Sequence, residues 1–387
     1  MRVKILIYWC CIVPNLIFAQ ESSKFVFKSF QKNIAFVYYD SISASPSTII
    51  EYPKFIVIVE LPFIDEGANK ATDLTEDIPK AKQLLAYLKH KYNKPVKYVL
   101  SSHWHLHSIS GITPFLESGA KLIVSKTNWK YSIDNGLMAP DKAKSFSKNT
   151  IEITKDTTLL SEYEVPIKIY FLDKTYINKP TEDYLFFYFP TLKTLHASCM
   201  CAISTVDFEK NKNYIYSDRV TDLNKVITQH NLEIEYLIKL TSEKEKEKSG
   251  FKLPVFTNDY FTAFMKNGNA METVIRNYTS LDIKTLKEEK QKLLYESITK
   301  KVNPAVLNAA VYSCLKSKDY ERALALAELL VLYRPDERNY IDTLGETHYF
   351  AGNMEAAEYY SYILNKLDPK ATAPIKSWEQ NKANNHP

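Results

Sequence analysis

Three histidines alternate within five residues of one segment, at His103, His105 and His107. An apolar run at residues 96–100 directly precedes them and predicts a buried strand. Neutral imidazole is a good zinc ligand, and side chains that alternate at a strand end can turn toward one point. Packing in a hydrophobic core does not readily explain three histidines so close together. The alternative to a metal site is a cluster of histidines exposed to solvent. We therefore predict a metal site, with zinc as its ion, at the end of this strand.

A second group of candidate ligands follows another predicted strand, at residues 184–189. His196 and Cys199 come after the turn that ends this strand. A thiolate is stabilised by zinc, and tetrahedral N/S coordination is what zinc prefers. Cys199 can equally be a small buried residue at a strand end. His196 is the weaker candidate, because side chains alternate along a strand and the sequence does not determine the geometry of the turn.

The elements that must position these residues indicate a mixed α/β domain. Strands are expected at residues 24–30, 34–39, 55–60, 96–100, 121–124, 167–172 and 184–189. A Ser/Pro cluster at residues 43–47 is interpreted as a break between the early strands. Apolar residues recur at helical spacing over residues 76–92, and Pro95 then admits the next strand. Sheet on both sides of the core is the expected architecture.

These segments resemble the metallo-β-lactamase superfamily, and more closely its metallo-hydrolase branch. The apolar run Phe55 to Glu60, a helix, and then Lys94 to His105 look like the family's approach to its HxHxDH motif. The stretch from Tyr188 to Cys199 resembles the strand, turn and strand that end in a later metal ligand, usually Asp and in some lactamases Cys. The resemblance covers roughly residues 24–260. It implies a four-layer αββα sandwich with its metals in a groove at one edge of the two sheets.

Only part of the family's motif is present in this chain. His103 and His105 match the first two histidines, and Cys199 matches the later ligand. His107 stands where the family has Asp, and Ser108 stands where the motif has its last His. In the family the missing Asp orients the zinc-bound hydroxide. The departure therefore predicts hydrolysis that is weak or absent.

Two further histidines of the family are missing. Neither residues 178–183 nor residues 253–258 contain a histidine, although the resemblance places one ligand near each segment. A dinuclear site needs two sets of ligands, so we expect at most one zinc ion and allow that none binds. The candidate ligands are His103, His105, His107, His196 and Cys199.

Beyond about residue 268 the strand pattern ends and the remaining sequence looks helical. Ala323 and Ala357 lie 34 positions apart, which is the period of the tetratricopeptide repeat. Gly345 stands early in the first helix of the second unit, where a small residue lets the paired helix approach closely. About two repeats are covered, so we expect these helices to pack against the α/β domain. Generic helical hairpins are the alternative.

The first 19 residues are typical of a secretory signal peptide. Arg2 and Lys4 precede an apolar stretch, and Ala19 stands just before Gln20, where cleavage is expected. The alternative is a membrane anchor, but about 14 apolar residues fall short of the roughly 20 that a spanning helix needs. We therefore expect a secreted or periplasmic protein that has no membrane span after cleavage.

Length and charge limit the remaining function classes. The 387 residues suffice for two domains, and we expect a signal at 1–19, the metallo-β-lactamase-like domain at 20–265 and the helical segment at 266–375. The 50 basic and 45 acidic residues are scattered, without the one-sided basic cluster of a nucleic-acid-binding surface. We predict no nucleic-acid partner.

Two hypotheses about function remain. The first is an exported metallo-hydrolase-like protein with a degraded zinc site, at most mononuclear, that acts weakly or not at all on a small-molecule substrate. The second is an inactive scaffold that binds a peptide or protein partner through its groove and its tetratricopeptide-like helices. Zinc content distinguishes them most directly.

Overall fold

The computed structural model describes residues 25–39, 46–61, 78–203, 215–239, 253–299, 302–369 and 373–383. The predicted signal peptide lies outside the described residues. The chain divides into two compact units, the first made of Met1–Ala202 with Arg219–Phe261 and the second of Ile203–Asp218 with Thr262–Pro387.

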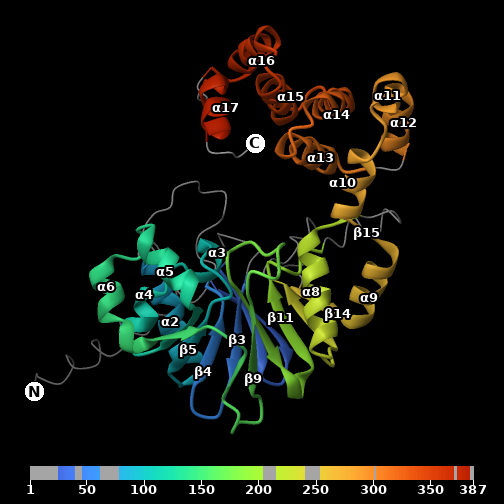
Figure 1. The fold of residues 1–387 in the computed structure, drawn as a ribbon. Helices are drawn as coiled ribbons and strands as arrows, with labels where there is room; N and C mark the ends of the chain where they lie inside the picture. Colours follow the sequence, from blue (N-terminus) through green and yellow to red (C-terminus); the bar gives the residue numbers. More distant parts are fainter. Residues whose placement is uncertain are drawn as a thin grey trace, which may run out of the picture. The chain divides into compact units, whose positions relative to one another are not determined.

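A seven-stranded mixed sheet forms one half of the first unit (Figure 1). In sheet order its strands are β1 (Phe25–Gln31), β2 (Ile34–Tyr39), β3 (Ser47–Glu51), β4 (Ile56–Val59), β5 (Val96–Leu100), β6 (Lys121–Ser125) and β7 (Thr150–Ile153). Neighbours from β1 to β4 pair antiparallel, and neighbours from β4 to β7 pair parallel. The parallel half needs crossovers, which are helical here. They contain α2 (Ile78–Tyr92), α3 (Leu106–Ile109), α4 (Thr113–Glu117), α5 (Lys126–Asp134), α6 (Pro140–Ser145) and the 3-10 turn η2 (Ser147–Asn149).

A six-stranded sheet forms the other half of this unit. In sheet order its strands are β14 (Val255–Thr257), β13 (Tyr236–Lys239), β11 (Thr194–Ser198), β10 (Tyr184–Phe189), β9 (Ile167–Leu172) and β8 (Thr157–Leu159). All neighbours pair antiparallel except β11 and β13, which are parallel. The 3-10 turn η3 (Pro190–Leu192) joins β10 to β11, and the crossover from β11 to β13 contains α8 (Asp218–Gln229).

Side-chain alternation along β4 shows how the layers pack. Ile56 and Ile58 join the core that includes residues of α2 and α4, whereas Val57 and Val59 join the core between the two sheets. A strand covered on both faces should be a continuous apolar run, as the Ile-Val-Ile-Val of β4 is. The expected α/β sandwich, two sheets with helices outside, is therefore confirmed.

Two strands of the first sheet, β3 and β7, were not predicted. β3 begins at Ser47, inside the Ser/Pro cluster that was expected to separate the early strands. Its pairing with both β2 and β4 supplies hydrogen bonds that override the weak local preference of serine. β7 was not predicted because its four residues, Thr-Ile-Glu-Ile, give too short an alternation to detect.

The second unit is helical. Its helices are α10 (Met271–Thr279), α11 (Ile283–Glu288), α12 (Lys290–Thr299), α13 (Pro304–Lys316), α14 (Tyr320–Tyr333), α15 (Arg338–Phe350), α16 (Met354–Leu367) and α17 (Pro374–Ala383), and a small sheet pairs β12 (Ile215–Tyr216) with β15 (Asn269–Ala270). Helix α9 (Asn258–Asn267) spans the boundary between the units. The starts and ends of α13 and α14 recur in α15 and α16 after 34 positions. This confirms a repeated helical hairpin.

Gly345 allows a close approach within this helical unit. A Cβ atom built on Gly345 would lie 2.6 Å from Trp378 Cη2 and 2.9 Å from Tyr360 Cβ. The indole of Trp378 is 1% exposed, and its Nε1 donates a hydrogen bond to Asp342 Oδ1 at 3.1 Å. Two helices therefore approach Gly345 too closely for a larger side chain: the paired helix α16, and α17, which packs on the second hairpin. The prediction that this position needs a small residue is confirmed.

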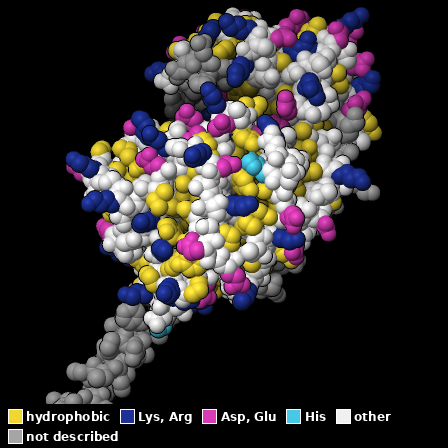
Figure 2. Space-filling model, turned by 60° about the horizontal axis from the view of Figure 1, so that its bottom comes forward, with side chains coloured by type: hydrophobic (Ala, Val, Ile, Leu, Met, Phe, Trp, Pro, Cys, Tyr) yellow, Lys and Arg dark blue, Asp and Glu magenta, His cyan; other side chains and the backbone are white. Residues whose placement is uncertain are grey.

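Figure 2 presents one face of the molecule, on which basic and acidic side chains are interleaved with apolar ones. Among the described residues, no helix is both long enough and apolar enough to cross a bilayer.

Candidate metal centre

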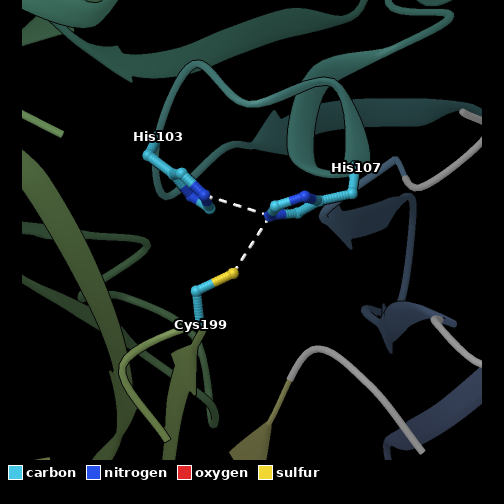
Figure 3. Close-up of side chains that lie close together, drawn as sticks. All are labelled: His103, His107 and Cys199. Atoms are coloured by element: carbon cyan, nitrogen blue, oxygen red, sulfur yellow. Dashed lines mark hydrogen bonds between the residues drawn. The ribbon is translucent and has the colours of Figure 1, made fainter. Parts of the chain in front are cut away.

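His103, His107 and Cys199 point toward one another from two separate segments of the first unit (Figure 3). His103 lies in the turn that follows β5, and His107 lies in the first turn of α3. Cys199 comes directly after β11 in the second sheet. The three candidate donors therefore come from segments that follow strands of both sheets.

The three donor atoms are close enough to share one ion. His107 Nε2 lies 3.1 Å from His103 Nε2 and 3.0 Å from Cys199 Sγ, and all three donor atoms lie within 4.8 Å of one another. In a tetrahedral zinc site, bonds of about 2.0–2.1 Å to nitrogen and 2.3 Å to sulfur place neighbouring donors about 3.3–3.6 Å apart. The N/N/S chemistry of the set fits a single zinc ion, and small side-chain shifts would bring the three donor atoms to this spacing.

Burial favours the ligand form of His103. Its side chain is fully buried, and desolvation holds its pKa well below the usual value. Positive charge on His107, His105 and Arg219 would lower this pKa further. His103 is therefore a neutral imidazole, which is the form that binds a metal.

Outer contacts hold two of the donors in place. Ser102 Oγ lies 2.7 Å from His103 Nδ1, so the hydroxyl fixes the imidazole at the nitrogen that faces away from the cluster. The ring of Tyr184 stacks on that of His103 with a centroid distance of 5.0 Å. The Tyr184 hydroxyl accepts a hydrogen bond from the backbone N–H of Cys199 at 2.9 Å. One tyrosine thus contacts both halves of the centre.

His105 lies outside this group of donors. Its ring is 4.6 Å from that of His103, centroid to centroid, and 4.5 Å from that of Trp104, whose own ring stacks on Tyr131. Alternation along a strand suggested that all three histidines could converge. The chain instead enters α3 directly after His105, and the helical turn brings His107 back to His103.

His196 also lies outside the group and is buried in the core. It pairs with Phe187 across β11 and β10, so both side chains face the interior between the two sheets. It is 2% exposed, and burial lowers its pKa to about 3. Its Nδ1 atom has no hydrogen-bond partner among the described residues. Strand β11 ends at Ser198, which has a positive φ of 47°, and the next residue, Cys199, belongs to the donor group.

Glu60, which was not among the predicted site residues, also lies beside the candidate centre. Its side chain is fully buried beside the centre, and its Oε1 accepts a hydrogen bond from the backbone N–H of Ser102 at 3.0 Å. Burial raises its pKa to about 7, and the hydroxyls of Ser102, Ser108 and Ser198 oppose part of that rise. The signal available in the sequence was the position of Glu60, a charged residue directly after the apolar strand β4.

No protein-family model matches the sequence, and no curated protein matches it. Solved structures that are similar to this chain include metallo-β-lactamases. The one from Pontibacter korlensis has a TM-score of 0.43 and 13% identity, and the match covers 62% of this chain and 97% of that one. FIM-1 from Pseudomonas aeruginosa in a mono-zinc form has a TM-score of 0.42 and 13% identity, with 62% and 93% covered. The protein from Hirschia baltica has a TM-score of 0.42 and 13% identity, with 63% and 98% covered.

Proposed function

We propose that this chain is a metallo-β-lactamase-fold, hydrolase-like protein that holds at most one zinc ion through His103, His107 and Cys199. The observation that carries the proposal is the convergence of two imidazole nitrogens and one thiol sulfur within 4.8 Å. The partial HxHxDH motif and the two-sheet sandwich support the family assignment. These three donors replace the set that the motif comparison favoured, which contained His105 instead of His107.

The arrangement of donors supports weak hydrolysis or none. A zinc ion, when bound, supplies Lewis acidity that lowers the pKa of a coordinated water. An efficient site also needs a base that holds this water, and no carboxylate belongs to the described group of donors. His107 directs Nε2 to the same centre as His103, so it acts as a ligand and is not available as a base. We therefore propose that turnover of lactam, ester and phosphodiester substrates is slow or undetectable.

The test is zinc stoichiometry on the purified full chain and on single alanine variants. We expect about one ion per chain at most, and loss of most zinc affinity in His103→Ala, His107→Ala and Cys199→Ala. The matched control is His105→Ala, which removes an imidazole that lies outside the donor group. Two tightly held ions per chain, or a larger loss in His105→Ala than in His107→Ala, would overturn this ligand assignment.

The proposed location is the periplasm or the extracellular space, supported by the signal-like residues 1–19. Mass spectrometry of the protein from its native cells should give a chain that begins at Gln20. A native chain that retains Met1 would refute export by cleavage.

Binding of a protein partner is the second candidate function. The repeated hairpins favour it, because helical repeats present extended binding surfaces. On α16, Tyr359 and Tyr362 are 60% and 61% exposed and stand three positions apart, so they share one face. If no metal binds under zinc supplementation and no substrate is turned over, a partner-binding role is the better proposal.

A further inference from the structure

Tyr184 is the first residue of β10, beside the point where the pairing of β10 with β11 stops. At this end the ladder pairs Phe187 with His196. The same antiparallel register, continued by three residues, would place Tyr184 opposite Cys199. Ser198 has a positive φ instead, so the chain departs from strand geometry directly before Cys199. The backbone ladder therefore does not hold the residue that carries the thiol.

The phenol of Tyr184 takes over the hydrogen bonds of the interrupted ladder. Its hydroxyl accepts from the backbone N–H of Cys199 at 2.9 Å and donates to Ala197 O at 3.3 Å. The side chain of Tyr184 is completely buried, and backbone groups in a protein interior need partners. One hydroxyl thus bonds the backbone on both sides of Ser198 and holds the turn that carries the thiol.

The ring of Tyr184 contacts the other half of the centre. It stacks on the imidazole of His103 with a centroid distance of 5.0 Å and an interplanar angle of 30°. Phe186, which shares a face of β10 with Tyr184, contacts the phenol ring edge-on at 5.6 Å. The backbone N–H of Leu185 donates to Ser102 O at 3.0 Å, directly before His103. The start of β10 therefore fixes both the histidine segment and the plane of one imidazole.

We propose that Tyr184 is a positioning residue that holds His103 and Cys199 at the spacing that one metal ion requires. The ring braces the imidazole, and the hydroxyl braces the turn that presents the thiol. These two donors come from separate segments of the chain (Figure 3), and Tyr184 is outside the donor group. Donors that are already in place need not be ordered when an ion binds, so positioning raises affinity. The effect on zinc binding rests on the proposed function, whereas the positioning itself does not.

The first test compares the zinc affinity of Tyr184→Phe and Tyr184→Leu in the full chain. Phenylalanine keeps the ring and removes the hydroxyl, whereas leucine removes both. Loss of an outer-shell partner typically weakens metal binding 10–100-fold, and we expect such a loss in Tyr184→Phe and a larger one in Tyr184→Leu. Unchanged affinity in Tyr184→Phe would refute the role of the hydroxyl. Equal losses in the two variants would refute the role of the ring.

Tyr188→Phe is the matched control for the lost hydroxyl. Tyr188 stands on the same strand and is 5% exposed, and its hydroxyl donates to Glu233 O at 2.7 Å. The substitution therefore removes a hydrogen bond from β10 that does not involve the donor group. Zinc affinity should stay unchanged in this variant. A loss equal to that of Tyr184→Phe would show that any hydroxyl removed from β10 weakens the centre, which would contradict the proposal.

The second test measures positioning in metal-free protein, by hydrogen exchange resolved to single amides. The N–H of Cys199 should exchange roughly 5–10-fold faster in Tyr184→Phe, because it loses its hydrogen-bond acceptor. Exchange at this amide should be unchanged in Tyr188→Phe. An unchanged rate in Tyr184→Phe would refute the positioning role even if zinc binds. If the unmodified chain binds no zinc, the proposed function fails and this test still decides the role of Tyr184.

A third measurement separates the thiol half of the centre and does not require Tyr184→Leu to fold. In the cobalt-loaded protein, Tyr184→Phe should weaken the charge-transfer band from the Cys199 thiolate to cobalt, whereas Tyr188→Phe should retain it. A full-strength band in Tyr184→Phe would show that the hydroxyl does not position the thiol.

Discussion

Two buried carboxyl groups, one in each unit, differ in how completely their oxygens are bonded. In the helical unit, Glu346 accepts hydrogen bonds from Tyr312 Oη at 2.8 Å and from Asn381 Nδ2 at 2.7 Å, one on each oxygen. In the sandwich unit, which the two sheets form, Glu60 has a hydrogen-bonded Oε1, whereas its Oε2 has no hydrogen-bond partner among the described residues. Glu346 also lies in regular helix, whereas Glu60 has a positive φ.

The two carboxyl groups therefore differ in whether their hydrogen bonding is complete. Native proteins bond nearly all of their buried polar atoms, and Glu346 follows that rule. Departures are expected where function requires an arrangement that folding alone would not select. The incomplete bonding and the backbone strain at Glu60 both lie next to the candidate metal centre. We therefore expect perturbations of the helical unit to change stability alone, and perturbations near Glu60 to change stability, pH dependence and metal binding together.

The largest expected effect is on the helical unit. Trp378→Ala empties a site that is 1% exposed and removes the hydrogen bond to Asp342, so it should destabilise this unit by about 3–5 kcal/mol. Hydrogen exchange followed by mass spectrometry should show faster exchange in α15 to α17. Zinc affinity should stay unchanged. A loss of zinc affinity as large as that of His107→Ala would show that the two regions are not energetically independent.

The same contrast explains what the sequence could predict. The 34-residue period gave the helical hairpins because regular helices repeat their contacts at fixed spacing. The apolar runs likewise predicted five of the seven strands of the first sheet, but only β9 and β10 of the six strands of the second. The partnership of His103 with His107 was not predictable, since it depends on a turn into α3 directly after His105. Glu60 was missed because burial of a charged residue next to a distant serine is a tertiary property.

Acid should destabilise the sandwich unit through His196. Burial lowers its pKa from about 6.5 to about 3, so the folded state disfavours the charged form. Stability is therefore present above pH 6.5 and is lost as the pH falls toward 3, by about 2 kcal/mol at pH 5. His196→Phe should remove this loss, because Phe187 shows that the site accepts an aromatic ring. Denaturant unfolding at pH 5 and pH 7 measures the contribution of His196 as a difference between the two proteins, and the same pH dependence of stability in both would contradict the assignment.

The titration of Glu60 should oppose the effect of His196 on the pH dependence of stability. Its pKa rises from 4.5 to about 7, so its contribution to stability is present below pH 4.5 and is lost as the pH rises through 7. Between pH 5 and pH 7 the loss is about 2 kcal/mol, similar to the gain from His196 and opposite in sign. Together, the titrations of His196 and Glu60 should therefore change the stability of the unmodified protein little between pH 5 and pH 7. Glu60→Gln should reveal the acid loss and His196→Phe the alkaline loss. Parallel pH profiles for the two variants would refute this pairing.

The smallest effect is expected for Glu346→Gln in the helical unit. At neutral pH the carboxylate accepts from two donors, whereas the isosteric amide offers one oxygen and turns an NH₂ group toward the other donor. The lost bond should cost about 1 kcal/mol, seen as a lower denaturant midpoint with an unchanged m-value. Burial raises the pKa of Glu346, so the cost should shrink as the pH falls and the carboxyl takes up a proton. Asn381→Ala, which removes the donor from α17 and leaves the carboxyl, should cost a similar amount. If Glu346→Gln instead altered zinc affinity, the contrast between the fully hydrogen-bonded carboxyl of Glu346 and the incompletely hydrogen-bonded carboxyl of Glu60 would fail.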